Sequence, residues 1–193
     1  MLANLHRYKI ILASNSPRRK ELLSGLGISF EVKTTPGLDE SYPDSLQSNE
    51  IALYVAAKKA KAYLPALQKN ELLITADTIV CINNQILGKP ADRADAFRML
   101  QTLSAKTHEV ITGVCLTAQS KSVSFSVVST VRFAPLDEED IIYYIDTCRP
   151  YDKAGAYGIQ EWIGYVAVEA IQGSFYNVMG LPVQRLYQEL LKF

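Results

Sequence analysis

The sequence has few of the side chains that crosslink a fold or hold a structural metal. Its three cysteines, Cys81, Cys115 and Cys148, lie far apart, and His6 and His108 are the two histidines. This spacing suggests neither a disulfide framework nor a zinc site. We therefore expect the cysteines to be small core residues, and we expect His108 to be a hydrogen-bonded structural residue rather than a catalyst.

An excess of either charge is also absent. The 20 basic and 20 acidic residues cancel, and no basic stripe with interleaved aromatic residues is present. The net field of the protein therefore offers no attraction to nucleic acid, and we expect no such partner. Any site for an anion must be local.

Long apolar runs are missing as well. The run at residues 10–13 is shorter than the ~7–15 residues of a signal-peptide core, and no run approaches the ~18 residues of a membrane span. Low-complexity tracts and repeats of fixed period are not found either. We expect one folded domain over residues 1–193, located in the cytoplasm, without a membrane partner.

Short apolar patterns of both helical and strand type are present instead. They predict strands at residues 9–13, 72–75, 109–117, 123–133 and 166–171, and helices at residues 17–26, 49–64, 93–103, 137–146 and from Pro182 onward. Residues 80–87 resemble a hairpin turning at Asn83 and Asn84, and residues 177–180 resemble a turn. The mixture predicts an α/β fold with a mixed, strongly twisted sheet flanked by helices.

The first predicted helix begins with cations where the helix dipole favours acids. Ser16 suits the N-cap, and Arg18, Arg19 and Lys20 follow in the first turn, against a preference of ~0.3–1 kcal/mol each. A bound phosphate would gain the free N–H groups of this turn, the hydroxyls of Ser14 and Ser16, and the guanidinium groups. A solvated basic turn is an equal alternative from this turn alone.

Three further charged residues adjoin apolar or stiff segments. Asp77 follows the apolar run 72–74, so we expect it at the end of a buried strand, where α/β proteins place ligand crevices. Such a carboxylate could activate water, hold a divalent metal or merely cap a turn. The stem of Lys59 extends along an apolar helix face, and its ammonium group could reach a cleft. The alternative is that Lys59 only snorkels to the solvent. Lys89 lies in a Gly-Lys-Pro loop and could offset phosphate charge.

Seven short segments form a pattern that extends across nearly the whole chain. They are LASNSPRR at residues 12–19, KKAKA at 58–62, ADT at 76–78, GKP at 88–90, THEVITGV at 107–114, DKAGAYGIQ at 152–160 and NVMGLP at 177–182. In this order they resemble the Maf family of nucleoside triphosphate pyrophosphatases. Several segments alone are weak signals, whereas seven in register are strongly specific.

The resemblance implies a fold, an activity and a cofactor. The fold would be the mixed α/β fold shared with inosine triphosphate pyrophosphatase-like proteins, with two lobes and a central cleft, and the protein would be a homodimer. The activity would be cleavage of a nucleoside triphosphate between the α and β phosphates, with Mg²⁺ or Mn²⁺ as the cofactor.

The resemblance also implies roles for individual residues. Asp77 would activate the water, and the triphosphate would be held by Ser14, Ser16, Arg18, Arg19, Lys59 and Lys89. Glu40 would bind the metal together with Asp77, with Asp39 as an alternative to Glu40.

Base preference is implied by a further set of positions. Arg18, Thr78 and Gln160 match positions linked to substrate choice in the subgroup of dTTP/UTP pyrophosphatases, and AGAYGIQ favours this subgroup over the one acting on 7-methyl-GTP. The Gln160 amide offers both a donor and an acceptor to the imide edge of thymine or uracil. The chain departs from many relatives at Glu161 and Trp162, where a small Gly-containing segment is usual, and at Ala105, where a glycine is usual.

Together these features predict a pyrophosphatase that converts dTTP and UTP to the monophosphate and pyrophosphate. Modified pyrimidine nucleotides would be further substrates in a housecleaning role. The alternative is a nucleotide-binding regulator of septum formation and cell division, without essential catalysis.

Overall fold

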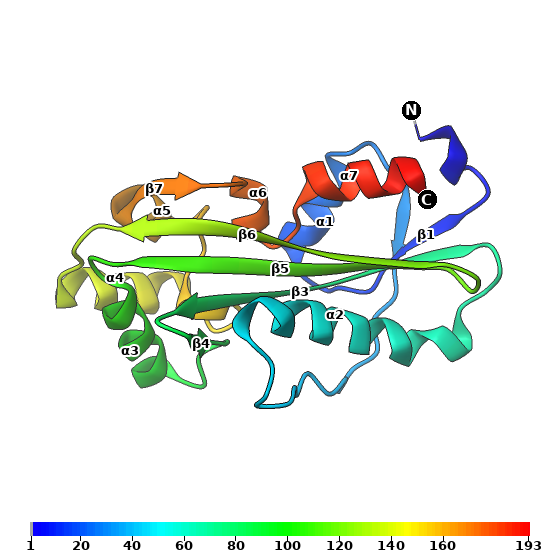
Figure 1. The fold of residues 1–193 in the computed structure, drawn as a ribbon. Coiled ribbons are helices and arrows are strands. Elements are labelled where there is room, and N and C mark those ends of the chain that lie inside the picture. The colour runs from blue at the N-terminus through cyan, green and yellow to red at the C-terminus, as the bar shows by residue number, and fades with distance from the viewer. Residues whose placement is uncertain (1) are drawn as a thin grey trace. The chain divides into compact units, whose positions relative to one another are not determined.

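The computed structural model describes residues 2–193, which form a mixed α/β fold (Figure 1). The strands are β1 (Lys9–Leu12), β2 (Phe30–Val32), β3 (Glu71–Ile82), β4 (Gln85–Leu87), β5 (Thr107–Thr117), β6 (Ser122–Phe133) and β7 (Val168–Gln172). They form one 7-stranded sheet in the order β2-β1-β3-β5-β6-β7, with β4 paired to β3. Strand β1 is parallel to β2 and β3, whereas β4 and β7 are antiparallel to their neighbours, which confirms the predicted mixed sheet.

Helices flank this sheet. They are α1 (Pro17–Ser24), α2 (Ser48–Tyr63), α3 (Arg93–Leu103), α4 (Glu138–Cys148), α5 (Trp162–Ala167), α6 (Phe175–Met179) and α7 (Val183–Lys192), with 3₁₀ turns η1 (Ala3–Leu5), η2 (Leu64–Ala66) and η3 (Ala154–Ala156). Within residues 2–193, none of the helices combines the length and the apolar character that crossing a bilayer requires.

The chain divides into two compact units. Unit 1 comprises Met1–Asp77, Thr112–Val127 and Gly180–Phe193, and unit 2 comprises Thr78–Ile111 and Val128–Met179. Strands β3, β5 and β6 each contribute residues to both units. The single domain expected over residues 1–193 stays a prediction.

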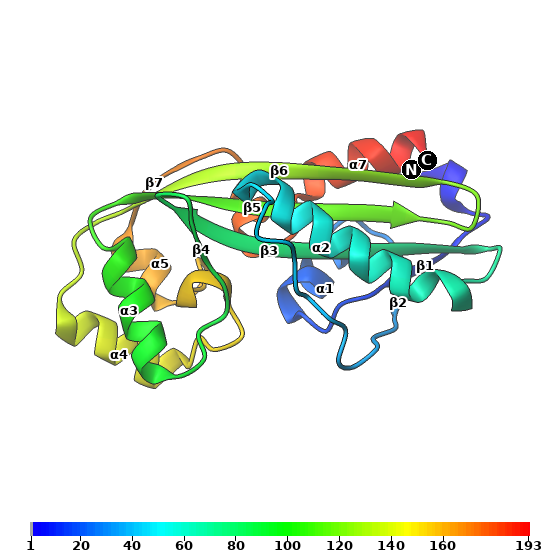
Figure 2. The same ribbon diagram turned by 60° about the horizontal axis from the view of Figure 1, so that its bottom comes forward.

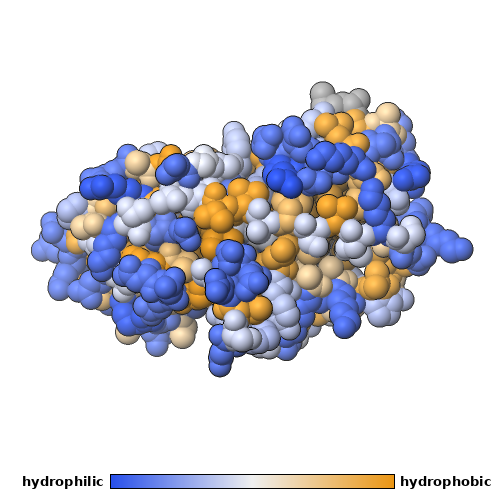
Figure 3. All heavy atoms as spheres, viewed as in Figure 1, coloured by the Kyte–Doolittle hydropathy of each residue, from blue (hydrophilic) through white to orange (hydrophobic). Residues whose placement is uncertain are grey.

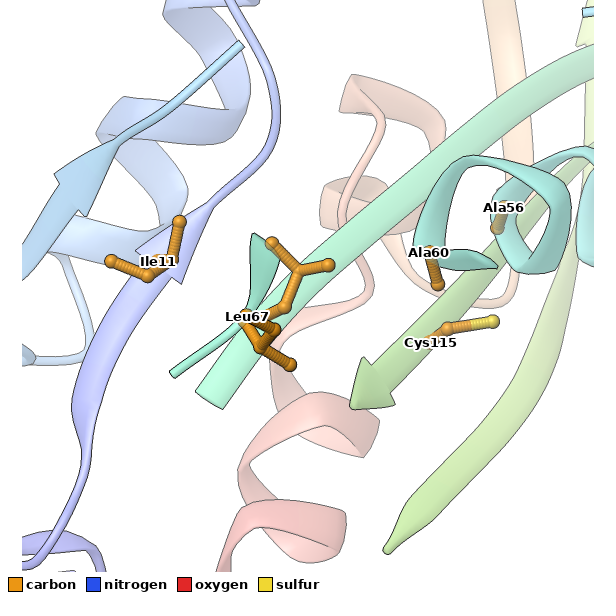
Figure 4. Close-up of a cluster of buried hydrophobic side chains, with 6 residues drawn as sticks. Ile11, Ala56, Ala60, Leu67 and Cys115 are labelled. Atoms are coloured by element: carbon orange, nitrogen blue, oxygen red, sulfur yellow. The ribbon is translucent and has the colours of Figure 1, made fainter. Parts of the chain in front are cut away.

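In unit 1, α2 covers one face of the strands and α7 lies over the other face (Figure 2). A buried cluster beneath α2 consists of Ile11, Ala56, Ala60, Leu67, Leu73 and Cys115. Figure 4 shows Ala56 and Ala60 directed from α2 at the sheet, next to Cys115 on β5. A Cβ atom on Gly113 of β5 would lie 2.4 Å from the backbone carbon of Ala52, so only glycine allows α2 to approach so closely.

In unit 2, an exposed ion pair joins two helices, and aromatic contacts surround a buried histidine. The guanidinium of Arg93 on α3 donates two hydrogen bonds, at 2.7 and 2.9 Å, to Asp146 on α4. His108 is buried against Phe133 and Tyr157, and its Nε2 lies 2.8 Å from the Tyr157 hydroxyl. Burial lowers the pKa of His108 to about 4, which supports the structural interpretation of this residue.

Local sequence signals predict several element boundaries well. The Ser16 hydroxyl accepts a hydrogen bond from the Arg19 N–H at 3.4 Å, as expected of an N-cap. Asn83 and Asn84 have positive φ of 50° and 62° at the predicted hairpin turn. Ala105 also has a positive φ, of 57°, a backbone conformation that glycine adopts more readily than alanine.

Two predicted local structures are wrong. Residues 177–180 were expected as a turn, but Asn177 lies inside α6, where its amide donates to Val110 O and Ser129 Oγ, both at 3.0 Å. The strand expected to stop before Asp77 continues to Ile82 as β3. Elements β2, α5 and α6 were not predicted, because such short segments depend on tertiary contacts.

The surface agrees with the balanced composition. Figure 3 shows one face on which hydrophilic residues predominate and hydrophobic residues gather in small patches between them. Cys81 and Cys115 are buried, whereas Cys148 is half-buried. All three are free thiols.

Candidate active site

Unit 1 gathers two carboxylates around one lysine. The Nζ atom of Lys59 lies 2.8 Å from Oδ1 of Asp77 and 2.8 Å from Oε1 of Glu40. The Lys59 side chain is 11% exposed and that of Asp77 is 15% exposed, whereas Glu40 is 47% exposed. The cluster therefore has a shielded interior and one carboxylate open to solvent.

Helix α2 and strand β3 place Lys59 and Asp77 opposite each other. Alternate residues of a strand share a face, so Thr75 and Asp77 both point to the same side of β3. Thr75 is fully buried and donates a hydrogen bond to Ala56 O of α2 at 2.8 Å. Lys59 follows Ala56 by one helical turn and meets Asp77 further along the strand.

The position of Asp77 differs from the sequence prediction. Strand β1 pairs with β3 only as far as the Leu12 and Ile74 pair, so the parallel pairing ends before Asp77. Strand β3 itself continues to Ile82: it is also paired with β5, and its last residues pair antiparallel with β4. Asp77 thus lies beyond the end of a neighbouring strand but inside its own.

Arg19 brings positive charge to the same two carboxylates. Its Nε donates to Gly180 O at 2.9 Å and its Nη1 donates to Ala76 O at 2.9 Å. Burial lowers the pKa of Arg19, while the negative charges of Asp77 and Glu40 act in the opposite direction. Asp77 and Glu40 thus supply negative charge close to Arg19, in the basic first turn of α1.

The remaining predicted residues of this region lie at or just before the N-terminus of α1. Ser14 is buried, and its hydroxyl accepts a hydrogen bond from the Ser16 N–H at 3.2 Å. Arg18 is half-buried, and its charge lowers the pKa of Arg19. Hydroxyls, backbone N–H groups and guanidinium groups thus occur together at one helix N-terminus, which is a favourable environment for an anion.

Asp39 and Glu40 differ in their ion-pair partners. Asp39 pairs with Lys58 at 2.6 Å, whereas Glu40 pairs with Lys59. Hydrogen bonds from Lys58 and Ser41 lower the pKa of Asp39. The chain therefore joins Glu40 to Asp77 through a shared lysine and holds Asp39 in a separate exposed ion pair.

Three predicted site residues belong to unit 2. Thr78 follows Asp77 on β3 and is half-buried, and Lys89 is exposed in the loop after β4. Gln160 is exposed in the turn that precedes α5. Within unit 2, the loop of Lys89 is tied to the loop that leads to Gln160, because the Gly155 N–H donates to Gly88 O at 3.0 Å.

A second charged cluster, in unit 2, was missed by sequence reasoning. Lys153 is 8% exposed and pairs with Asp152 at 2.6 Å and with Glu161 at 2.9 Å. The buried hydroxyl of Tyr144 also donates to Glu161. The unusual DKAGAYGIQ segment was the available signal, but the partner Tyr144 comes from a different element, α4.

The residues around Lys59 suit a hard divalent cation. Two carboxylates converge on a single positive group, and Mg²⁺ commonly binds one or two carboxylates while substrate phosphates and waters complete its shell. Groups of three or more His, Cys, Asp or Glu residues with metal-site geometry do not occur among residues 2–193. The protein would therefore supply only part of the ligand set.

Comparisons with known proteins identify the family of the chain. The family model described as "Maf-like protein" matches residues 9–193. A protein named dTTP/UTP pyrophosphatase from Parabacteroides distasonis is 63% identical over 193 residues, with 100% of both chains covered. A protein of the same name from Phocaeicola vulgatus is 62% identical over 192 residues, again with 100% of both chains covered.

A solved structure of the Staphylococcus aureus Ham1 protein also aligns with the chain. It is 17% identical, with 95% of this chain and 98% of that chain covered, and the TM-score is 0.48.

Proposed function

The chain belongs to the Maf-like protein family, and from this premise we propose that it hydrolyses dTTP and UTP to the monophosphate and pyrophosphate. Relatives that match it from end to end carry the name of that activity. Modified pyrimidine triphosphates, which keep the same triphosphate and a related base edge, belong to the same proposal. The protein is an enzyme, a nucleoside triphosphate pyrophosphatase.

The observation that carries the proposal is the cluster of Lys59, Asp77 and Glu40, with Arg19 beside it. A triphosphate needs cations that neutralise the charge that develops during bond cleavage. Hydrolysis also needs a carboxylate that accepts a proton from water. Both kinds of group occur here in a shielded position.

In the proposed reaction, Asp77 accepts a proton from a water molecule while the water oxygen attacks a phosphorus of the triphosphate. The bond between the α and β phosphates breaks. Attack at the α phosphorus expels pyrophosphate with the electron pair of that bond, and attack at the β phosphorus expels the monophosphate with it. Lys59 and Arg19 neutralise the developing charge. In unit 1, the α1 turn with Ser14, Ser16 and Arg18 holds further oxygens of the triphosphate. Lys89 keeps its proposed role as a phosphate-binding residue.

Glu40 and Asp77 would hold the proposed Mg²⁺ or Mn²⁺. When bound, the cation would polarise phosphate oxygens and lower the pKa of a coordinated water. The convergence of both carboxylates on Lys59 supports this role. We also propose that Arg18, Thr78 and Gln160 determine which base is accepted. The amide of Gln160 would form hydrogen bonds with the imide edge of thymine or uracil.

The first experiment measures turnover with and without the carboxylate of Asp77. Purified protein with Mg²⁺ or Mn²⁺ should convert dTTP and UTP to monophosphate and pyrophosphate, separated by anion-exchange chromatography. Asp77→Asn should lower kcat by about 10³-fold, because a general base contributes ~10²–10⁴-fold.

Asp39→Asn is the matched control, because Asp39 lies next to Glu40 but pairs with Lys58. It should keep kcat within about twofold of the wild type, in line with the small contribution of an exposed ion pair. Thermal melting of both variants reports folding. Full turnover by a folded Asp77→Asn variant would remove Asp77 from the mechanism, and binding of dTTP without turnover by the wild type would favour a regulator of septum formation.

The assembly and location of the protein remain part of the proposal. We propose a homodimer in the cytoplasm that acts on small nucleotides and has no nucleic-acid or membrane partner. Sedimentation equilibrium would measure the mass of the assembly, and a monomer at micromolar concentration would contradict the dimer.

A further inference from the structure

Gln160 lies in a tight turn whose ends are held within unit 2. The Glu161 N–H donates to Gly158 O at 2.9 Å, which closes a four-residue turn with Ile159 and Gln160 at its centre. Ile159 is buried, whereas Gln160 is exposed. The exposed amide is therefore carried by a short segment whose position depends on the two end residues, Gly158 and Glu161.

A single hydroxyl group contacts both ends of this turn. The Tyr144 hydroxyl accepts a hydrogen bond from the Gly158 N–H at 2.9 Å and donates one to Oε2 of Glu161. Tyr144 is 0% exposed on α4. Burial, and then the hydrogen bond to Glu161, raise the pKa of Tyr144, so its hydroxyl keeps the proton that it donates.

The other carboxylate oxygen of Glu161 is held as well. Nζ of Lys153 lies 2.9 Å from Oε1 of Glu161. A Cβ atom on Gly158 would lie 2.7 Å from Cδ of Glu161 and 2.9 Å from Cε of Lys153, so both side chains pack directly on the glycine. The end residues of the turn are thus fixed by hydrogen bonds, an ion pair and close packing.

We infer that Tyr144 and Glu161 are positioning residues, which hold the turn of residues 158–161 and so orient the Gln160 amide toward the pyrimidine base. The inference rests on the proposed function, in which Gln160 selects dTTP and UTP. An amide distinguishes an imide edge from the amino edge of cytosine only when its donor and its acceptor are aimed correctly.

The test compares substrate discrimination between two variants of neighbouring tyrosines. Tyr144→Phe removes the hydroxyl that contacts both ends of the turn, and the ratio of kcat/KM for dTTP to that for CTP should fall by about tenfold, the size expected for one or two lost hydrogen bonds. The change should appear mainly in KM for dTTP. Tyr143→Phe is the control, because Tyr143 is 52% exposed on the same helix and packs against Trp162; its ratio should match the wild type.

Glu161→Gln provides a second variant that keeps the shape of the side chain. It weakens the ion pair with Lys153 and should lower the same ratio, by a smaller factor than Tyr144→Phe. If Tyr144→Phe does not fold, Glu161→Gln alone tests the inference. An unchanged ratio of kcat/KM for dTTP to that for CTP in this variant would then overturn it.

The outcomes separate this inference from the proposed function. If the wild type hydrolyses no nucleoside triphosphate, the proposed function fails. If the wild type prefers dTTP but folded Tyr144→Phe keeps the same preference with a lower melting temperature, Tyr144 is merely structural and the inference fails. An unchanged preference in Gln160→Ala would also overturn it, since no amide would then need orienting.

Discussion

Each of the two units contains a nearly buried lysine between two carboxylates. In unit 1, Lys59 lies 2.8 Å from both Asp77 and Glu40, and in unit 2, Lys153 lies 2.6 Å from Asp152 and 2.9 Å from Glu161. The lysine side chains are 11% and 8% exposed, respectively. Residue types, distances and burial are nearly the same, so the ion pairs alone do not distinguish the two clusters.

The surroundings of the carboxylates differ. Glu161 also accepts from the buried Tyr144 hydroxyl, so the fold itself holds both of its oxygens. Glu40 is 47% exposed, and Arg19 is a second cation close to the unit 1 carboxylates. We infer that the unit 1 cluster can exchange its internal partners for a polyphosphate, whereas the unit 2 cluster supports structure.

The strongest test of this contrast replaces each lysine with methionine. Lys59→Met should lower kcat/KM for dTTP by about 10³-fold, because preorganised charge stabilises the transition state. Its free energy of unfolding should fall by about 1 kcal/mol, less than is usual for a shielded pair, since Arg19 still compensates Asp77. Lys153→Met should instead destabilise the protein by about 2 kcal/mol, below the value for a fully buried pair because Glu161 is 28% exposed.

Urea unfolding and steady-state kinetics on both variants measure the two effects. If folded Lys153→Met loses turnover while Lys59→Met keeps it, the Lys153 cluster is the one that acts in catalysis and the Lys59 cluster is structural. Equal effects of the two substitutions would remove the contrast between the clusters.

The sequence predicts the parts of the site that depend on local patterns. The N-cap at Ser16 and the placement of Lys59 on the apolar side of α2 both follow from residue spacing, and both agree with the structure. The hairpin at Asn83 and Asn84 follows from their tolerance of positive φ. These features need no information from distant segments.

Tertiary contacts decide the features that the sequence did not predict. Asp77 lies within β3 because one continuous strand joins residues 72–75 to the predicted hairpin of residues 80–87, whereas the sequence patterns indicated two separate elements. The place of Glu40 opposite Lys59 depends on the path of a loop, and only the family resemblance pointed to it. The contact between Tyr144 and Glu161 joins α4 to the start of α5, a short helix that propensity does not predict.

Two glycines offer the next test: Gly113 packs against the helix that carries Lys59, and Gly158 packs against Glu161 and Lys153. A Cβ atom on Gly113 would lie 2.4 Å from the backbone of Ala52, on the helix that carries Lys59, and backbone cannot move aside locally. We expect Gly113→Ala to destabilise the protein by about 3 kcal/mol, the upper range for overpacking. Gly158→Ala should cost about 1 kcal/mol, because the atoms that it meets belong to the side chains of Glu161 and Lys153.

Chemical unfolding of both alanine variants gives the two free energies. An equal or larger loss in Gly158→Ala would mean that the Lys153 cluster is as rigid as the backbone packing beneath α2.

The smallest expected effect is on the Mg²⁺ requirement, which should distinguish the adjacent residues Glu40 and Asp39. Glu40→Gln should raise the Mg²⁺ concentration for half-maximal activity by about tenfold, because one of two proposed carboxylate ligands loses its charge. Asp39→Asn should leave that concentration unchanged, since Asp39 pairs with Lys58 in an exposed position. Titration of activity with Mg²⁺ at saturating dTTP measures both values. An equal shift in the two variants would point to the general negative charge of the loop, rather than to the specific pairing of Glu40 with Lys59, as the feature that attracts the cation.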